Sequence, residues 1–137
     1  MGIHCEILVV DDEHIVGERI KAAIEKNGHH VETFSDPAKA LRRLDTKEFN
    51  IVISDIRMGE VDGIKVMEKV FETSPNVVVI MITGYATLEL ARESLAKGAF
   101  GFIAKPFKLK EIRKTIQKAV DHLEQKQNRD NIGSAAQ

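Results

Sequence analysis

Short runs of apolar residues alternate along this chain with segments in which apolar residues recur every three or four positions. The runs have the length of β-strands and few polar interruptions, which is typical of strands covered on both faces. The expected strands are 6–10, 31–34, 50–54, 77–82 and 100–104. Strands that alternate with helices predict one parallel sheet with helices on both faces.

Helical spacing fills the segments between these runs. In the helix expected over 13–27, the side chains predicted to face the sheet are Ile15, Val16, Ile20, Ala23 and Ile24. Gly28 is placed to end that helix, and Asp36 and Pro37 fit the cap and first turn of the next one. A loop containing Asp62 and Gly63 precedes the third helix, whose expected inward residues are Ile64, Met67, Val70 and Phe71.

The last two helices differ in length. The inward residues predicted for the fourth are Leu88, Ala91 and Leu95, with Gly98 closing the helix. The fifth is expected over 109–126, with Ile112, Ile116, Ala119, Val120 and Leu123 on one side. The polar, weakly patterned residues 127–137 indicate a tail or the start of a linker, so one domain is expected over 1–126.

The composition narrows the classes of function. A chain of 137 residues suits one domain, and 20 basic against 21 acidic residues leave no basic field to attract nucleic acid or an anionic membrane. The single cysteine, Cys5, excludes an internal disulfide and fits the reducing cytoplasm. No apolar run approaches the 18 or so residues of a membrane span, and no signal peptide is expected.

Polar side chains stand where the expected strands end. Asp11 and Asp12 follow the first strand, Asp55 the third, Thr83 the fourth and Lys105 the fifth. Right-handed crossovers favour the doubly wound, flavodoxin-like order 2-1-3-4-5, in which the first and third strands are neighbours. Ligands in such sheets bind at the carboxyl ends of the strands, so three carboxylates are expected to converge beside a hydroxyl and an ammonium.

This set of groups suits phosphoryl chemistry on a carboxylate. Mg²⁺ prefers oxygen ligands and binds through one or two carboxylates together with phosphate oxygens. A carboxylate can accept a phosphoryl group and become an acyl phosphate. Lys105 and Thr83 could then neutralise the oxygens of the transferring group, and Gly84 lets the backbone approach it closely.

Four motifs in the right order carry a resemblance that covers residues 5 to 125. The stretches ILVVDDE, VISDIRM, VIMITGYA and GFIAKPF resemble the receiver domain of two-component response regulators. The resemblance implies that Asp55 is the phosphoacceptor and that Asp12 binds Mg²⁺ directly, assisted by Asp11. It implies that Asp55 and the backbone carbonyl of Arg57 complete the protein ligands of the metal.

The resemblance also implies a switch and a donor. Lys105 would pair with the phosphoryl group, Thr83 would move toward it, and the aromatic ring of Phe102 would follow. The donor would be a sensor histidine kinase or a phosphotransfer protein. VIMITGYAT is most similar to receivers of transcription regulators that contain an ATPase module and act with alternative sigma factors.

Two positions depart from the family pattern. Gly59 stands where the family often has proline, which frees the loop, and Phe102 stands where it often has tyrosine, which removes a hydroxyl. The family usually has a cis bond at the position of Lys105-Pro106, which would turn the chain and aim Lys105 at the site. The face formed by the fourth helix, fifth strand and fifth helix is a common dimer surface in the family, and Tyr85 and Leu90 are the residues expected to be exposed there.

Other interpretations of the same residues remain open. One alternative is a receiver-fold binding module that is regulated without phosphorylation. Such a module needs no intact acceptor site, so the presence of Asp12, Asp55, Thr83 and Lys105 argues against it. A turnover enzyme of the aspartyl-phosphate hydrolase type needs an added cap or pocket, for which this chain has no residues to spare. The histidines are expected to be solvated: His4, His14, His29, His30 and His122.

Overall fold

The computed structural model of the chain describes residues 3–58, 61–84 and 87–135. The strands of its main sheet are β1 (Glu6–Val10), β2 (His30–Phe34), β3 (Ile51–Asp55), β6 (Val78–Thr83) and β7 (Gly101–Ala104). The helices are α1 (His14–Glu25), α2 (Pro37–Leu44), α3 (Gly63–Thr73), α4 (Leu88–Ala96) and α5 (Leu109–Ala135). Two short strands, β4 (Arg57–Met58) and β5 (Val61–Asp62), form an antiparallel pair after β3 that the sequence pattern did not predict.

The main sheet is parallel and has the predicted doubly wound order. Its strands lie in the order β2-β1-β3-β6-β7, which is 2-1-3-4-5 when only the five main strands are counted. Val9 of β1 pairs with Ile53 of β3, and Asp55 of β3 pairs with Ile82 of β6. The carboxyl ends of β1, β3 and β6 therefore meet at one edge of the sheet.

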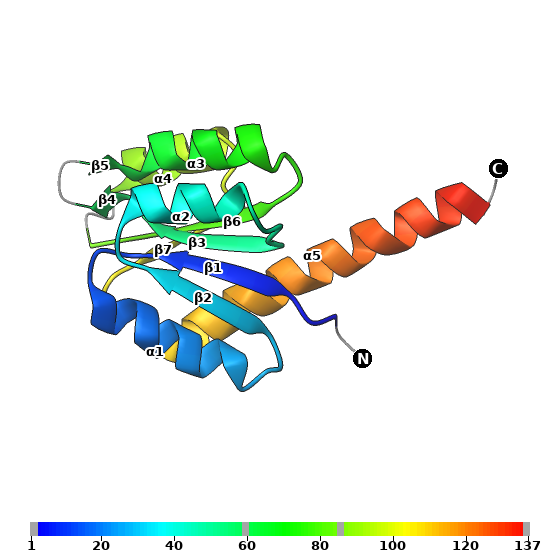
Figure 1. Cartoon of the computed structure of the whole chain (residues 1–137), viewed down its shortest axis with the longest axis horizontal. Helices are drawn as coiled ribbons and strands as arrows, with labels where there is room; N and C mark the ends of the chain where they lie inside the picture. Colours follow the sequence, from blue (N-terminus) through cyan, green and yellow to red (C-terminus); the bar gives the residue numbers. More distant parts are fainter. Residues whose placement is uncertain (1–2, 59–60, 85–86, 136–137) are drawn as a thin grey trace.

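Helices cover both faces of this sheet. Figure 1 shows α1 and α5 on one side and α2, α3 and α4 on the other. Strand residues alternate between two apolar clusters, so that Val9 and Ile53 pack on the α1 and α5 side while Leu8 and Val52 pack on the other. All four of these side chains are fully buried, which explains why the strands read as continuous apolar runs.

Local sequence signals fix three of the helix ends, two of them, at Asp36 and Gly28, as predicted. The Asp36 carboxylate caps α2 by accepting a hydrogen bond from the backbone N–H of Ala38 at 2.9 Å, with Pro37 in the first turn. Asp62 caps α3 through Ile64 N–H in the same way. Gly28 follows α1 with a φ of 89°, a left-handed conformation that favours glycine.

Three inward placements predicted from helical spacing are wrong. Ile15 of α1 is 72% exposed, and Leu88 and Leu95 of α4 are 67% and 50% exposed. Leu90, expected to be exposed, is half-buried and packs against the apolar cluster on the α2 and α3 side. The buried residue of α4 is Ser94, so this helix turns its apolar stripe outward.

The last helix is longer than the sequence pattern predicted. It was expected to end near residue 126, but α5 continues to Ala135 and runs out past the edge of the sheet (Figure 1). Among residues 109–130, whose side chains the structure describes, the buried ones are Ile112, Ile116, Ala119 and Val120, all in the first half of the helix. From Glu124 to Asp130 the helix carries only polar side chains, and none of them is buried. The division at residue 126 stays a prediction.

A histidine expected to be solvated belongs to the interior. His29 is 7% exposed, and its Nδ1 accepts a hydrogen bond from the backbone N–H of Cys5 at 3.0 Å. Burial, reinforced by the nearby His4, lowers the pKa of His29 below its ordinary value. His29 thus joins the N-terminal segment to the turn before β2 as a neutral acceptor.

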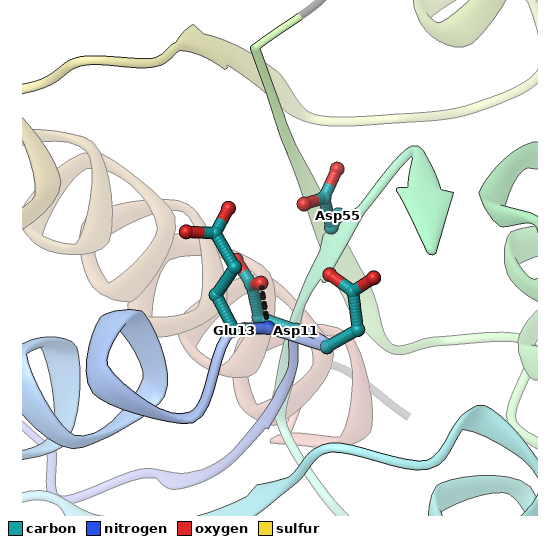
Figure 2. Close-up of side chains that lie close together, drawn as sticks. Asp11, Glu13 and Asp55 are labelled. Carbon is teal, nitrogen blue, oxygen red and sulfur yellow. Dashed lines mark hydrogen bonds between the residues drawn. The ribbon is translucent and has the colours of Figure 1, made fainter. Parts of the chain in front are cut away.

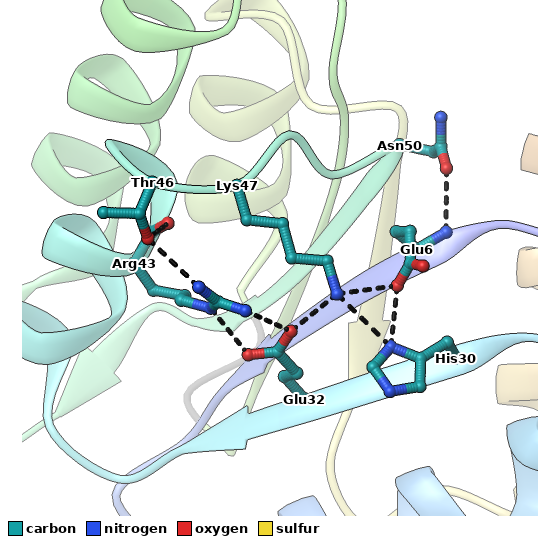
Figure 3. Close-up of polar contacts among 7 residues, drawn as sticks. All are labelled: Glu6, His30, Glu32, Arg43, Thr46, Lys47 and Asn50. Carbon is teal, nitrogen blue, oxygen red and sulfur yellow. Dashed lines mark hydrogen bonds and ion pairs between the residues drawn. The ribbon is translucent and has the colours of Figure 1, made fainter.

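Charged side chains cover the edge strand β2 on its α2 side. Glu32 accepts hydrogen bonds from Arg43 Nε at 2.8 Å and from Lys47 Nζ at 2.7 Å (Figure 3). Lys47 also pairs with Glu6 at 3.0 Å, and Glu6 contacts His30 Nδ1 at 2.7 Å. Charges of this kind on an edge strand oppose pairing with a further strand.

No helix among residues 3–58, 61–84 and 87–135 is long and apolar enough to cross a bilayer.

Candidate functional site

Four carboxylates gather where β1 and β3 end. Asp11 follows β1 and is 2% exposed, and Asp55 is the last residue of β3 and is 4% exposed. Asp12 and Glu13 are exposed at the start of α1. Each of the four offers an oxygen within 4.8 Å of the others, and Figure 2 shows Asp11, Glu13 and Asp55 converging. The predicted convergence of Asp11, Asp12 and Asp55 is confirmed.

The Lys105 ammonium lies among these acids. Its Nζ is 2.7 Å from Asp55 Oδ2, 2.9 Å from Asp11 Oδ2 and 3.2 Å from Glu13 Oε1. The Lys105-Pro106 bond is cis, as expected. Although burial disfavours the charged ammonium, the hydrogen bond to Asp55 and the negative charges of Asp11 and Asp55 raise the pKa of Lys105 above its ordinary value. Lys105 is therefore a permanent cation at this site.

The Asp11 carboxylate is held with one oxygen incompletely satisfied. Its Oδ1 accepts the backbone N–H of Glu13 at 2.8 Å. Its Oδ2 is buried and close to Lys105 Nζ, yet it receives no well-directed hydrogen bond, so charge alone holds that contact. Burial raises the pKa of Asp11 above its ordinary value, against the opposing pull of Lys105. A buried carboxylate oxygen with spare capacity suits a hard divalent cation.

The remaining predicted residues surround the acids. Thr83, fully buried, ends β6, and its backbone oxygen accepts the N–H of Lys105 at 2.7 Å. The Arg57 N–H donates to Asp55 Oδ1 at 3.1 Å, which places the Arg57 backbone beside the acceptor strand. Phe102 is half-buried on β7, which β6 separates from β3, and it packs toward the side of the sheet that α2, α3 and α4 cover. Gly59 and Tyr85 lie outside the described residues.

Glu13 is the site residue that sequence reasoning missed. It directly follows Asp11 and Asp12 in the sequence, yet its carboxylate contacts Lys105, 92 positions away in the chain. Both side chains line an open cavity of about 370 Å³ beside the acids, whose apolar wall includes Val16, Pro106 and Phe107. The order of strands alone could not have indicated this contact, because β3 and β6 lie between β1 and β7 in the sheet.

Comparison with known proteins decides the family. The chain matches the family described as "Response regulator receiver domain" over residues 7–117. The chain belongs to the response regulator receiver domain family. It is therefore a phosphoacceptor signalling domain of the kind found in two-component response regulators. The resemblance carried by the four sequence motifs is confirmed.

Individual relatives of this receiver domain include regulators of different length. The transcriptional regulatory protein ZraR of Klebsiella oxytoca is 31% identical over 121 residues, which are 88% of this chain and 27% of that protein. The response regulator receiver protein CpdR of Brucella abortus is 33% identical over 112 residues, 82% of this chain and 93% of that protein. The chain thus spans about a quarter of ZraR and nearly all of CpdR.

A solved receiver shares the fold closely. The solution structure of the beryllofluoride-activated NtrC4 receiver domain dimer has a TM-score of 0.81 and 32% sequence identity, and covers 85% of this chain and 97% of that one. The match extends the family assignment from motifs to the whole arrangement of strands and helices.

Proposed function

We propose that this receiver accepts a phosphoryl group on Asp55 and passes the signal to an output partner by a change of conformation. The observation that carries the proposal is the pairing of the buried Asp55 carboxylate with Lys105 Nζ at 2.7 Å, inside a cluster of further acids. An isolated ammonium and carboxylate would make an ordinary ion pair. Here the surplus of negative charge leaves the site in need of a further cation.

The transfer itself is a displacement at phosphorus. An Asp55 carboxylate oxygen attacks, the new P–O bond forms an acyl phosphate, and the bond between phosphorus and the donor breaks. The donor leaves with the electron pair of the broken bond. If the donor is a phosphohistidine, its ring nitrogen keeps that pair, and the side chain becomes a neutral imidazole after taking up a proton. Lys105 turns from the Asp55 carboxylate to the phosphoryl oxygens, which now carry the charge.

The acids fit a magnesium ion. Asp11 and Asp12 would hold it with Asp55 and the backbone carbonyl of Arg57, and the incompletely satisfied Asp11 Oδ2 supports this assignment. When bound, the ion neutralises charge that develops on the phosphoryl oxygens. The chain's own residues do the rest: Asp55 supplies the nucleophile, and Lys105 supplies a cation that stays charged.

Thr83 and Phe102 are suited to report the modification. Thr83 ends the strand next to β3, and Phe102 lies across from Met81 on the adjoining strand β7. A new phosphate on Asp55 would draw the Thr83 hydroxyl and allow the Phe102 ring to repack. The phosphoryl group would thereby shift a pre-existing equilibrium between two forms of the domain.

The partners follow from this chemistry. A sensor histidine kinase or a phosphotransfer protein of the cytoplasm would supply the phosphoryl group. A second copy would bind the face formed by α4, β7 and α5, where Leu88, Leu95 and Phe100 are exposed. The dimeric state of the NtrC4 receiver supports this use, and the exposed leucines replace Leu90 as the residues to test.

The dimer is tested by changing these leucines. Leu88→Lys with Leu95→Lys should abolish any increase in molar mass on phosphorylation, measured by light scattering, because charges replace the apolar contact. Ile15→Lys on α1 is the matched control, since Ile15 is equally exposed on the opposite side of the sheet. Association that survives both leucine changes would place the interface elsewhere.

Intact mass spectrometry tests the proposed chemistry. The protein is incubated with a small acyl phosphate and Mg²⁺, beside Asp55→Asn and a chelator control. A gain of one phosphoryl group in the wild type, absent from both controls, supports the proposal. No gain in a folded wild type would favour the binding module that is regulated without phosphorylation.

A further inference from the structure

The residue at the start of α1 does not act as a helix cap. Glu13 occupies the N-cap position, but its side chain makes no capping hydrogen bond. The cap residues of α2, α3 and α4, which are Asp36, Asp62 and Thr87, all accept a backbone N–H. Glutamate is also absent from the residue types preferred at this position. The Glu13 carboxylate is therefore directed to something other than its own helix.

Its contact is the Lys105 ammonium. Glu13 Oε1 lies 3.2 Å from Lys105 Nζ, on the side that opens to the cavity of about 370 Å³. The other two partners of Lys105 are buried, whereas the Glu13 side chain is 66% exposed. Lys105 is thus held between two carboxylates in the interior and one at the mouth of the site.

The three carboxylates have different fates during phosphoryl transfer. Asp55 loses its carboxylate charge when it becomes an acyl phosphate, and Asp11 is one of the proposed metal ligands. Glu13 is neither the proposed phosphoacceptor nor one of the proposed metal ligands, so among the three it is the one that can remain a carboxylate partner of Lys105. Its backbone N–H meanwhile holds Asp11 Oδ1 at 2.8 Å, which fixes where the Glu13 side chain begins.

We propose that Glu13 is a positioning residue that keeps the Lys105 ammonium at the mouth of the site, facing an incoming phosphoryl group. This inference rests on the proposed function of Asp55 and Lys105. Without Glu13, Lys105 would settle wholly on Asp11 and Asp55, where it blocks the nucleophile and competes with a metal ion. With Glu13 present, the ammonium is shared among three carboxylates, and it can turn toward the mouth of the site while keeping one of these ion pairs.

A double-mutant cycle tests the proposal. Glu13→Gln should slow phosphorylation by a small acyl phosphate at saturating Mg²⁺ by about two- to fivefold, the range for a partly exposed ion pair. In a Lys105→Ala background the same change should have almost no effect, because the group that Glu13 positions is gone. Glu18→Gln, an exposed acid one turn along α1, is the matched control and should match the wild type.

The cycle separates this role from a direct effect on the metal. Glu13 also offers an oxygen within reach of the acid cluster, so a rival role is to attract Mg²⁺. That role predicts a higher half-saturating Mg²⁺ concentration, and a loss of rate below saturation that is equal in both backgrounds and disappears at saturating Mg²⁺. Equal losses, or no loss in either, would overturn the proposal.

A second measurement does not depend on phosphorylation. Lysine labelled with ¹³C at Cε reports the surroundings of the Lys105 ammonium by NMR, with Lys105→Arg to assign the signal. Glu13→Gln should shift this signal and Glu18→Gln should not. An unshifted signal would overturn the positioning role. A shifted signal in a protein that gains no phosphoryl group would retain the Glu13 contact and reject the proposed function instead.

Discussion

Replacing Lys105 by methionine tests how far one cation holds the acid cluster together. Methionine keeps much of the volume of the lysine stem but removes its charge. The Asp11 and Asp55 side chains are 0% and 6% exposed, so neither can recover its lost partner through solvent. The variant therefore contains two buried carboxylates side by side without the ammonium that lay between them.

The cost can be worked from the geometry. Two unit charges 4.8 Å apart, the upper limit for these oxygens, repel by about 3.5 kcal/mol at an effective dielectric of 20. Removing one partner of a buried ion pair typically costs about 3–5 kcal/mol. Proton uptake by Asp11, whose pKa is already raised, relieves part of this cost. We expect Lys105→Met to lower the free energy of unfolding by about 3 kcal/mol at pH 7 without Mg²⁺.

Urea unfolding followed by circular dichroism measures this loss. The control is Lys97→Met, which removes exposed pairs with Glu68 and Glu93 and should cost less than about 1 kcal/mol. Added Mg²⁺ should stabilise Lys105→Met more than the wild type, because the ion takes over the neutralising role. A loss below that of Lys97→Met, or one that Mg²⁺ leaves unchanged, would refute the reasoning.

The same variant has a pH dependence of known sign. The pKa of Asp11 is raised in the folded protein, so the ionised carboxylate lowers stability when the pH is above that pKa. At low pH Asp11 is protonated in both the folded and the unfolded chain, and the effect disappears. Losing Lys105 raises this pKa further. The difference in stability between Lys105→Met and the wild type should therefore be largest near neutral pH and shrink as the acids protonate.

Three further predictions concern other parts of the fold. Gly63→Ala should cost about 3 kcal/mol of stability in urea unfolding, because the new Cβ would clash with the backbone oxygen of Asp55 and the backbone of Ile56. The wild type should lose stability as the pH falls through the ordinary histidine range, and His29→Asn should lose less, because His29 is buried as a neutral acceptor whose pKa is lowered. Glu32→Gln should lower the free energy of unfolding by about 1 kcal/mol at pH 7, and by less in high salt. The reason is that the hydrogen bond from Arg43 helps to lower the pKa of Glu32 to about 2.

The sheet and the meeting of the acids were predictable because they depend on strand order. Continuous apolar runs identified all five strands, and the handedness of crossovers placed β1 beside β3. Once that order is known, residues that follow the strands must share one edge. Asp11, Asp55 and Lys105 were found in this way although they are far apart in the chain.

Side-chain direction was harder to predict, since helical spacing defines a stripe but not the face against which it packs. Leu88 and Leu95 share a stripe that a second molecule could cover as readily as the sheet, and in this structure the stripe faces outward. His29 looked like a residue of a polar turn, and its burial depends on a hydrogen bond to a segment 24 positions away. The contact between Glu13 and Lys105 was not predictable from strand order, because it joins residues 92 positions apart that follow strands which are not neighbours in the sheet.

Mapping the modified residue shows directly whether Asp55 is the phosphoacceptor. Borohydride reduces an acyl phosphate to an alcohol, so treating the phosphorylated protein converts the modified aspartate to homoserine, which peptide mass spectrometry locates. Phosphorylation of Asp55 should give homoserine at position 55 and leave Asp11 and Asp12 unmodified. Homoserine at position 11 or 12, or a phosphoryl group that resists reduction because it sits on a hydroxyl or an imidazole, would contradict it.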